Sequence, residues 1–413
     1  MSFGSEARDY DILVAGGGMI GTSLAIALAP LGVRVGIVEA VARSAAGQPS
    51  FDERSTALSR SSQRMFTAMG LWDAIEAAST PIRHIHVSDR GRFGFSHIDA
   101  AEQGVEALGY VVINRVLGGV LQDALAALPG IDSICPGRIV GVEHDSDRVL
   151  ATIDEGGQAR TVSGSLLVAA DGARSSVREM LGIGASHVDY GQRAIIGNLL
   201  PERPHGNHAY ERFTETGALA LLPVSEERVA FVWILPHAEA DALVESRDDE
   251  FTARLQDAFG WRLGRFSRVG VRASYPLALS KASRLTAQRA VLVGNAAHGL
   301  HPVAAQGFNL GLRDVAALCD CIADRVADGC ADVGDALLLE RYADWRRDDQ
   351  RKLVGFTDGL VRLFGDRRRS VSVLRDLGML GFDLLPGVRR LFARHTMGLA
   401  GRLPRLSRGV PLG

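Results

Sequence analysis

Ile12-Leu13-Val14-Ala15-Gly16-Gly17-Gly18-Met19-Ile20-Gly21 is the stretch that decides the fold, because an apolar strand runs directly into a glycine-rich turn. A helix-like segment, Leu24 to Leu28, follows the turn. Gly16 permits the tight turn, Gly18 lets the backbone approach a pyrophosphate, and Gly21 lets helix and strand pack closely. The first amides of such a helix face the phosphates as free donors. The pattern predicts a dinucleotide-binding strand, turn and helix.

A second apolar strand, Val33 to Val38, ends at Glu39. The carboxylate of Glu39 comes 18 positions after Gly21, close to the interval at which an acidic residue accepts hydrogen bonds from a ribose. An acidic residue there favours adenosine with a free 2'-hydroxyl. The plain alternative is a glycine turn that merely joins a buried strand to a helix. The strand, the helix and Glu39 together argue against that alternative.

Two later segments carry the same kind of signal. Leu166 to Asp171 is an apolar strand that ends in an acidic residue, followed by Gly172. Ala290 to Val293 predicts another buried strand, and the run from Gly294 to Asn309 leads from it into a long helix with one apolar face. Three strand ends of this kind predict one nucleotide site built from distant parts of the chain.

Length and composition are those of a soluble enzyme. The chain has 413 residues, of which 46% are hydrophobic and 23% are charged, so it provides two or three domains' worth of core. A net charge of -2 gives no reason to expect nucleic acid as a partner. The four cysteines show no disulfide or metal-ligand spacing, so we expect reduced thiols, no metal and a cytoplasmic location.

The middle of the chain changes character. From about His187 to Tyr275, strand-like runs dominate, and Ile82 to His97 reads as a further part of the same sheet. The sequence therefore predicts an α/β protein: a Rossmann-like dinucleotide-binding domain with an inserted β-sheet domain and a helical C-terminal region. Apolar residues in Ala218 to Leu222 and Phe231 to Leu235 either line a cavity or build the core of that sheet.

The C-terminal region, residues 361–413, is basic. From Arg362 to Leu412 there are 11 arginines against three aspartates, interspersed with apolar residues. This composition suits an anionic lipid surface or an acidic protein partner. It is equally typical of the solvated face of packed C-terminal helices.

Several segments together resemble a known family, the FAD-dependent hydroxylases of ubiquinone biosynthesis, which have the para-hydroxybenzoate hydroxylase fold. The resemblance is closest to the 2-octaprenyl-6-methoxyphenol hydroxylase group and covers most of residues 9–350. It is carried, beside the glycine turn and Asp171-Gly172, by Phe51 to Ser59, Ala209 to Thr214, Gly217 to Pro223, Tyr275 to Leu279 and Gly294 to Arg313.

The resemblance implies a reaction and its partners. NAD(P)H reduces FAD, O2 adds to give a C4a-hydroperoxyflavin, and one oxygen is transferred to the ring of a polyprenylated phenol. A cytoplasmic protein, peripheral at the inner membrane, is expected, with the basic C-terminal region facing the membrane or other ubiquinone-biosynthesis proteins. The implied domains are an FAD-binding domain made of residues 1–80, 99–186 and 276–360, a substrate domain made of 81–98 and 187–275, and the basic helical region.

The resemblance also implies which residues hold FAD. Glu39 binds the adenosine ribose, Arg115 contacts the phosphate region, Asp171 supports the pyrophosphate end, and Arg54 lies near the flavin or the nicotinamide. Asn295 stands where the wider superfamily has an aspartate that contacts a ribityl hydroxyl. It keeps a carbonyl acceptor without the charge. The complete expected set is Gly16, Gly18, Gly21, Glu39, Arg54, Arg115, Asp171, Asn295, Pro302, Gly307, Phe308 and Asn309.

Helix-start amides near Gly307, Phe308 and Asn309 are expected to stabilise the negative charge of a reduced flavin ring. Arg54 has a plainer alternative, a surface ion pair with Asp52 or Glu53. No catalytic side chain is predicted, since nothing in the sequence places a histidine against a substrate hydroxyl. Two other functions remain open: a flavin reductase or dehydrogenase, and a non-catalytic FAD-binding scaffold of a ubiquinone-biosynthesis assembly.

Overall fold

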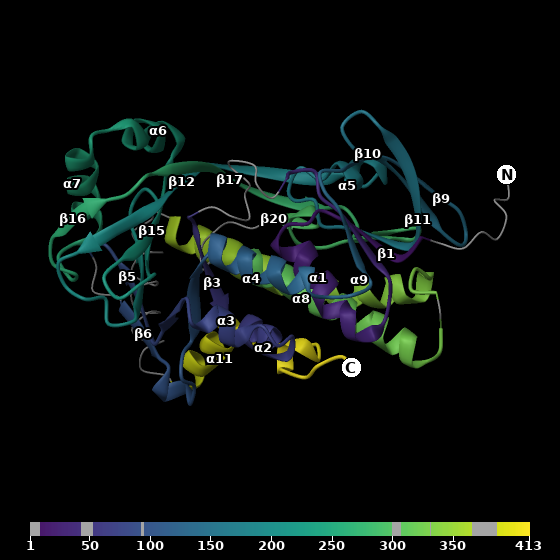
Figure 1. The fold of residues 1–413 in the computed structure, drawn as a ribbon. Coiled ribbons are helices and arrows are strands. Elements are labelled where there is room, and N and C mark those ends of the chain that lie inside the picture. The colour runs from purple at the N-terminus through teal and green to yellow at the C-terminus, as the bar shows by residue number, and fades with distance from the viewer. Residues whose placement is uncertain (1–8, 43–52, 92–94, 300–306, 331, 366–385) are drawn as a thin grey trace.

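Two large sheets stand side by side in the computed structural model, with long helices packed between and beneath them (Figure 1). The structure describes residues 9–42, 53–91, 95–299, 307–330, 332–365 and 386–413. The fold is the mixed α/β architecture that the sequence predicts. Within the described residues, no helix has the length and apolar character needed to cross a membrane.

The first sheet carries the nucleotide-binding strands. Its parallel part has the order β19, β11, β1, β2, β8. Three antiparallel strands extend it. The strands are β1 (Tyr10–Ala15), β2 (Val35–Val38), β8 (Ile131–Ile134), β9 (Arg138–His144), β10 (Val149–Asp154), β11 (Ala159–Ala169), β18 (Thr286–Ala287) and β19 (Ala290–Leu292).

Alternation along these strands divides the core into two layers. Ile12 and Val14 pack into one cluster with long helices, whereas Leu13 and Ala15 pack into the other with β9 and β10. The helices of the first layer are α1 (Met19–Leu28), α4 (Asn114–Ala126), α8 (Gly307–Ala327) and α9 (Ala336–Gly365). The short α5 (Ser176–Met180) covers the second layer. Both faces of the parallel strands are therefore buried, as parallel sheets require.

The second sheet contains the β-rich middle of the chain. Its main path is β20, β17, β12, β15, β14, β13, β5, β6, with β16 paired to β12. The strands are β5 (His84–Asp89), β6 (Phe95–Asp99), β12 (Ala185–Pro201), β13 (His208–Phe213), β14 (Ala218–Pro223), β15 (Val229–Pro236), β16 (Phe266–Val269), β17 (Ala273–Ala282) and β20 (His298–Gly299).

The two faces of this second sheet differ. Helices α6 (His237–Glu245) and α7 (Asp248–Phe259) cover one face. The aromatic and leucine side chains that point to them are Leu219, Leu221, Phe231, Trp233 and Leu235. Only the alternate residues of β14 and β15 are left for a cavity. In Ala218 to Leu222 and Phe231 to Leu235, the expectation of a cavity lining is therefore wrong for the alternate residues that pack against the helices, because these residues build the core.

The other face of the second sheet meets a small third sheet. That sheet has the order β3, β7, β4, with β3 (Ser55–Ser59), β4 (Ser79–Ile82) and β7 (Gly109–Ile113). Ala209 and Ala230 of the second sheet share a cluster with Val111 of β7, and Ala57 of β3 packs against it. The third sheet leads into α2 (Arg60–Ala68), and the short α3 (Trp72–Glu76) comes next along the chain.

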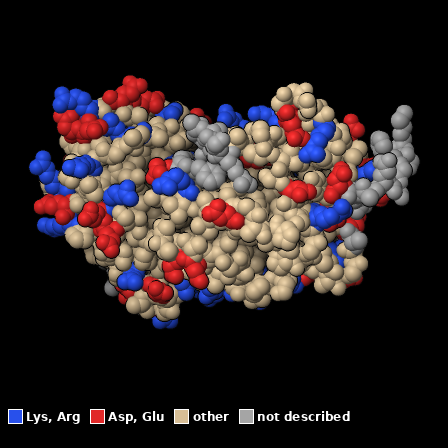
Figure 2. All heavy atoms as spheres, viewed as in Figure 1, with Lys and Arg blue, Asp and Glu red and all other residues tan. Residues whose placement is uncertain are grey.

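The described part of the basic C-terminal region packs on the protein. In α11 (Pro386–Thr396), Ala393 is fully buried beside Ile98. Arg389 forms an ion pair with Glu102 at 3.3 Å, and the backbone N–H of Arg405 donates to Asp320 at 3.0 Å. These observations match packed C-terminal helices. Lys and Arg side chains also interleave with Asp and Glu across the face shown in Figure 2.

His86 makes the second sheet sensitive to acid. It is 3% exposed, and its Nδ1 lies 2.7 Å from Nε2 of His97. Burial, together with the nearby charges of Arg262 and His97, lowers the pKa of His86 to about 3, against 6.5 for an ordinary histidine. Below pH 6.5 the unfolded chain binds a proton that the folded chain does not. Stability is therefore lost as the pH falls from 6.5 toward 3.

We expect His86→Phe to reduce this acid sensitivity, because an apolar ring of similar size takes up no proton. Urea unfolding at pH 7.5, 6.0 and 5.0 measures the effect. The slope of stability against pH should decrease by up to one proton relative to the wild type. His187→Phe, at an exposed position of β12, is the matched control and should keep the wild-type slope. Equal slopes for the wild type and both variants would show that His86 does not cause the acid sensitivity.

Candidate functional site

Three parallel strands end at one edge of the first sheet. The N–H of Gly16 donates to the carbonyl of Val38 at 2.8 Å, and the N–H of Ala170 donates to the carbonyl of Ala15 at 2.8 Å. Glu39, Gly16 and Asp171 therefore stand next to one another, although up to 155 positions separate them in sequence. The carboxyl edge of a parallel sheet is where such folds bind ligands.

The turn after β1 requires glycine at two positions. Gly16 has φ +101°, and a Cβ there would lie 2.6 Å from the carbonyl oxygen of Ala170. A Cβ on Gly21 would lie 1.9 Å from the carbonyl oxygen of Gly16. Gly16 therefore allows the backbone conformation and the contact with β11, and Gly21 allows α1 to approach the strand.

The N-terminus of α1 is left open toward this edge. Gly18 is its N-cap, and no described side chain caps the helix. The hydroxyl of Thr22 donates to the carbonyl of Gly17 at 2.9 Å, which secures the turn from its carbonyl side. The first amides and the positive end of the helix dipole therefore remain available to an anion.

Glu39 lies against the glycine turn. Its Oε2 accepts the N–H of Gly17 at 2.7 Å, and its Oε1 accepts the N–H of Val41 at 2.8 Å. A Cβ on Gly17 would lie 2.9 Å from Cβ of Glu39, so the strand end and the turn are in direct contact. The carboxylate stands at the end of β2, next to the turn, where a ribose is expected.

The second segment is tied to the third through Arg178. Asp171 accepts hydrogen bonds from the hydroxyl of Ser175 and, at 3.2 Å, from the N–H of Val177, so it holds the start of α5. Arg178 is 4% exposed and donates to the carbonyl of Ala296 at 3.1 Å. Sequence reasoning assigned no role to Arg178. Its buried guanidinium holds the end of β11 beside the loop that follows β19.

The first and third segments also touch. A Cβ on Gly294, which has φ +58°, would lie 3.3 Å from Cγ2 of Ile20. A Cβ on Gly311 would lie 2.8 Å from Cδ1 of the same isoleucine. The early turn and the late loop therefore share one region of the molecule, as a site made from both requires.

A buried carboxylate holds the third segment in place. Asp314, on α8, has no exposed surface. Its Oδ2 accepts the N–H of Gly294 at 2.9 Å and lies 2.6 Å from Nε2 of His298, while its Oδ1 accepts Nε of Arg346 at 2.6 Å. Tyr342, one turn before Arg346 on α9, donates its hydroxyl to Leu292 at 3.0 Å. One side chain thus fixes the loop to two helices.

The charges of this cluster support one another. Burial alone raises the pKa of Asp314, but His298 and Arg346 outweigh burial and lower the pKa to about 2. Asp314 and Asp349 in turn raise the pKa of Arg346 against its own burial. Both groups are therefore charged at neutral pH. Nδ1 of His298 is buried without a hydrogen-bond partner in the described part of the chain.

Asn309 joins α8 to the third sheet. Its side-chain carbonyl accepts the N–H of Ser59 at 2.8 Å and the hydroxyl of Ser62 at 2.7 Å, and its amide donates to Ala57 at 2.9 Å. The side chain of Asn309 is therefore used within the protein, where it joins α8 to β3 and α2. Gly307 and Phe308, which begin α8, keep part of their surface accessible.

The remaining predicted site residues have varied surroundings. The guanidinium of Arg54 lies 5.1 Å from the ring centre of Tyr275, a cation–π contact. Glu53 pairs instead with the exposed Arg115, at 2.7 Å. Asn295 is exposed between the buried Gly294 and Ala296. Pro302 and Asp52 lie outside the described residues. The roles in FAD binding expected of Arg54, Arg115, Asn295 and Pro302 stay predictions.

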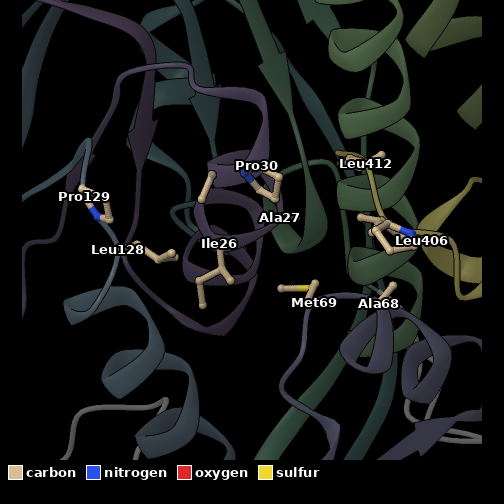
Figure 3. A pocket seen from close by; sticks show the side chains of 11 residues that line it. Ile26, Ala27, Pro30, Ala68, Met69, Leu128, Pro129, Leu406 and Leu412 are labelled. Atoms are coloured by element: carbon tan, nitrogen blue, oxygen red, sulfur yellow. The ribbon is translucent and has the colours of Figure 1, made fainter.

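An apolar pocket of about 320 Å³ lies at the opposite end of α1 from Gly18. Figure 3 shows its wall, which contains no charged or hydrogen-bonding side chain: Ile26, Ala27, Ala29, Pro30, Ala68, Met69, Leu128, Pro129, Leu406, Pro411 and Leu412. It has nothing to recognise a phosphate or a ribose. This pocket therefore does not match the nucleotide site that the sequence predicts at the other end of the helix.

Solved structures share the architecture. The p-nitrophenol 4-monooxygenase PnpA of Pseudomonas putida superposes with a TM-score of 0.78 at 18% identity, covering 96% of this chain and all of that one. Among known proteins, the chain is 40% identical to the ubiquinone hydroxylase UbiL of Rhodospirillum rubrum, over 99% of this chain and 95% of that protein. It is 31% identical to the 3-demethoxyubiquinol 3-hydroxylase of Escherichia coli, over 94% and 98%.

The family model and the relatives together define the class of protein as an FAD-dependent monooxygenase. The family model described as FAD binding domain matches residues 9–357, and the chain belongs to this FAD-binding family. FAD fits the residues present: an uncapped helix start faces an edge where glycine permits close approach, and an acidic residue ends the second strand.

Gly21→Ala should weaken both folding and FAD binding, because its Cβ cannot coexist with the carbonyl of Gly16 and α1 must move away from β1. We expect a loss of stability of roughly 1–3 kcal/mol, typical of overpacking, and loss of bound flavin. Gly119→Ala on α4 is the control: nothing lies within 4 Å of its Cβ, so it should be neutral or slightly stabilising. Urea unfolding measures the stability, and flavin absorbance measures the bound FAD. Equal stability and equal flavin content of Gly21→Ala and Gly119→Ala would refute the packing argument.

Asp314→Asn should be more damaging, because the buried Arg346 then lacks a charge to balance it. A loss of about 3–5 kcal/mol is expected for breaking one side of a buried pair. Asp344→Asn, which removes the exposed partner of Arg347 at 2.9 Å on α9, should change stability by less than about 1 kcal/mol. In the wild type, the contribution of Asp314 is present above pH 3.8 and is lost toward pH 2.

Chemical unfolding at pH 7 and pH 3 tests this expectation. The difference between wild type and Asp314→Asn should be smaller at pH 3. A wild-type-like stability of Asp314→Asn at pH 7 would show that the carboxylate does not hold the loop.

Proposed function

We propose that the chain is an FAD-dependent aromatic hydroxylase that uses NAD(P)H and O2 to hydroxylate a polyprenylated phenol in ubiquinone biosynthesis. The observation that carries the proposal is the 40% identity to a ubiquinone hydroxylase over nearly the whole of both chains. It is supported by the junction of three glycine-bearing segments at one edge of the first sheet.

FAD is expected to lie along this edge. Gly16, Gly18 and Gly21 would admit its pyrophosphate to the start of α1, and Glu39 would accept hydrogen bonds from the adenosine ribose. Asp171 and Arg115 are proposed at the phosphate region, and Asn295 at the ribityl chain. Arg54 is proposed beside the flavin or the nicotinamide. Pro302 and the backbone amides of Gly307, Phe308 and Asn309 complete the proposed set.

The chain's own contribution is binding, orientation and charge. When bound, FAD supplies the redox chemistry, taking a hydride from NAD(P)H and activating O2 for transfer to the phenol ring. The start of α8 is proposed to direct its first amides and the positive end of its dipole at the flavin, where they would stabilise negative charge. Asp314 and Asn309 keep that helix start in position, so neither contacts the substrate in this proposal.

The substrate is proposed to meet the second sheet. The proposed substrate domain comprises residues 81–98 and 187–275, and residues 1–80, 99–186 and 276–360 form the FAD-binding domain. A polyprenyl chain partitions into lipid, so the protein is proposed to work as a peripheral protein at a membrane surface. Within the C-terminal region 361–413, the described Arg389 is already paired with Glu102, so other residues would face the lipid.

Oxygen incorporation tests the proposal. Purified protein with FAD and NADH should consume O2 and add one oxygen atom to a polyprenyl phenol presented in phospholipid vesicles, as measured by mass spectrometry under ¹⁸O2. A reductase would oxidise NADH without labelled product, and a scaffold would leave NADH unchanged. A cell without the protein should accumulate the unhydroxylated prenyl phenol. Normal ubiquinone in that cell under aeration would overturn the proposal.

A further inference from the structure

A row of register partners crosses the second sheet on the face that meets the third sheet. Glu211 on β13 stands opposite Val87 on β5 and Ala220 on β14. Ala220 stands opposite Val232 on β15, which stands opposite Ile196 on β12. We call these five residues the Glu211 strip. All members but Glu211 are apolar.

The strip is less buried than its surroundings. Each of its five residues keeps part of its surface accessible. The neighbouring row on the same face is fully buried and comprises Ala194, Phe213, Ala218 and Ile234. On the opposite side of the strip, Ala209 and Ala230 are buried against the third sheet. Partial accessibility between two buried rows is what the floor of an enclosed hollow shows.

The face that bears the strip is the one toward the proposed flavin site. Ala57 of β3 packs against the cluster beside the strip, and the same residue accepts the amide of Asn309 at the start of α8. Tyr275, on the same face of β17 as the buried Leu277, carries the guanidinium of Arg54 over its ring. The strip therefore lies between the contact of Ala57 with Asn309 and the contact of Tyr275 with Arg54, both on the face toward the proposed flavin site.

Glu211 is chemically isolated in these surroundings. Its carboxyl has no hydrogen-bond or ion-pair partner within the described ranges, and burial raises its pKa from 4.5 to about 7. The nearest ionisable group by register is Asp89, two positions after Val87 on β5 and opposite Phe213. Arg54 lies several strands away. A carboxyl kept without a partner in an apolar hollow destabilises the fold, which a purely structural residue has no reason to do.

We propose that the Glu211 strip is the floor of the substrate cavity and that Glu211 is the catalytic base that takes the proton of the phenol. This inference rests on the proposed function. The proton passes from the phenol oxygen to a carboxylate oxygen of Glu211, and the electron pair of that O–H bond stays on the substrate. The resulting phenolate ring is richer in electrons and reacts faster with an electrophilic oxygen. Glu211 returns the proton to the product, so no net charge is transferred.

The chemistry of the strip also limits the substrate. Apolar side chains on both sides of one carboxyl suit a phenol ring that carries a hydrocarbon chain and one hydroxyl directed at Glu211. An anionic substrate, such as a free aromatic carboxylate, would be repelled by an ionised Glu211 in a medium of low polarity. The strip therefore favours neutral prenyl phenols over acidic aromatic compounds.

Glu211→Gln is the test, because glutamine keeps the shape and accepts no proton. We expect kcat for hydroxylation to fall by roughly 10²–10⁴-fold, the usual contribution of a general base, with little change in KM. The wild-type rate should rise with pH through about 7, and this ascending limb should be absent from the variant. Glu227→Gln, at an exposed position after β14, is the matched control and should behave as the wild type.

Two measurements separate this role from a structural one. Infrared difference spectra between wild type and Glu211→Gln should show a carboxylic acid band that titrates near pH 7 and shifts when a prenyl phenol binds. The folded state holds a proton on Glu211 that the unfolded chain releases between pH 4.5 and about 7, so the contribution of Glu211 to stability is lost as the pH rises across that interval. Glu211→Gln should lack this loss and be at least as stable as the wild type at pH 8.

The outcomes distinguish the two proposals. If the wild type forms no hydroxylated product, the proposed function fails. If the wild type forms product and Glu211→Gln keeps its rate, or loses rate with an unchanged pH profile, the function stands and the role of Glu211 as base is refuted.

Discussion

One buried carboxylate, Asp314, holds in place the late loop on which the proposed nucleotide site depends. It accepts hydrogen bonds from Gly294 and Arg346 and contacts His298, so it joins the end of β19, the loop after it and two helices. An isolated charge at zero exposure would be very unfavourable. Arg346, the contact with His298 and a backbone amide offset that loss, and the late loop is thereby fixed against Ile20 of α1.

The two large sheets divide the work according to how they are buried. The first has helices or strands on both faces, which makes the carboxyl ends of its strands a rigid edge for a cofactor. The second is covered by α6 and α7 on one face and is buried in two rows, one of them against the third sheet, on the other. Its other face is partly accessible along the Glu211 strip, and Asn309 connects that face to the start of α8 through β3. The surfaces proposed for cofactor and substrate are thus linked by a few direct contacts.

Local patterns in the sequence predicted the fold well, because the glycine turn, Glu39 and the strand periods each depend on residues close together in the chain. The parts that sequence reasoning missed depend on long separations. Asp314 meets Arg346 after 32 positions, and Arg178 meets Ala296 after 118. A charged residue inside an apolar helix stripe was the available signal for Asp314. Periodicity showed that β14 and β15 are strands, but it could not tell which alternate residues face the helices.

The same reasoning explains why Glu211 was not singled out from sequence. Within Ala209 to Thr214 it is one charged residue beside Arg212, which is typical of an ordinary exposed strand end. Only the register across five strands shows that its neighbours are apolar and that the rows beside it are closed. Residues that conflict with the stability of a fold, such as a charged group among apolar neighbours, occur mainly at functional sites. An unpaired carboxyl that weakens the folded state near neutral pH is such a break, and it stands on the face of the second sheet that we propose for the substrate ring.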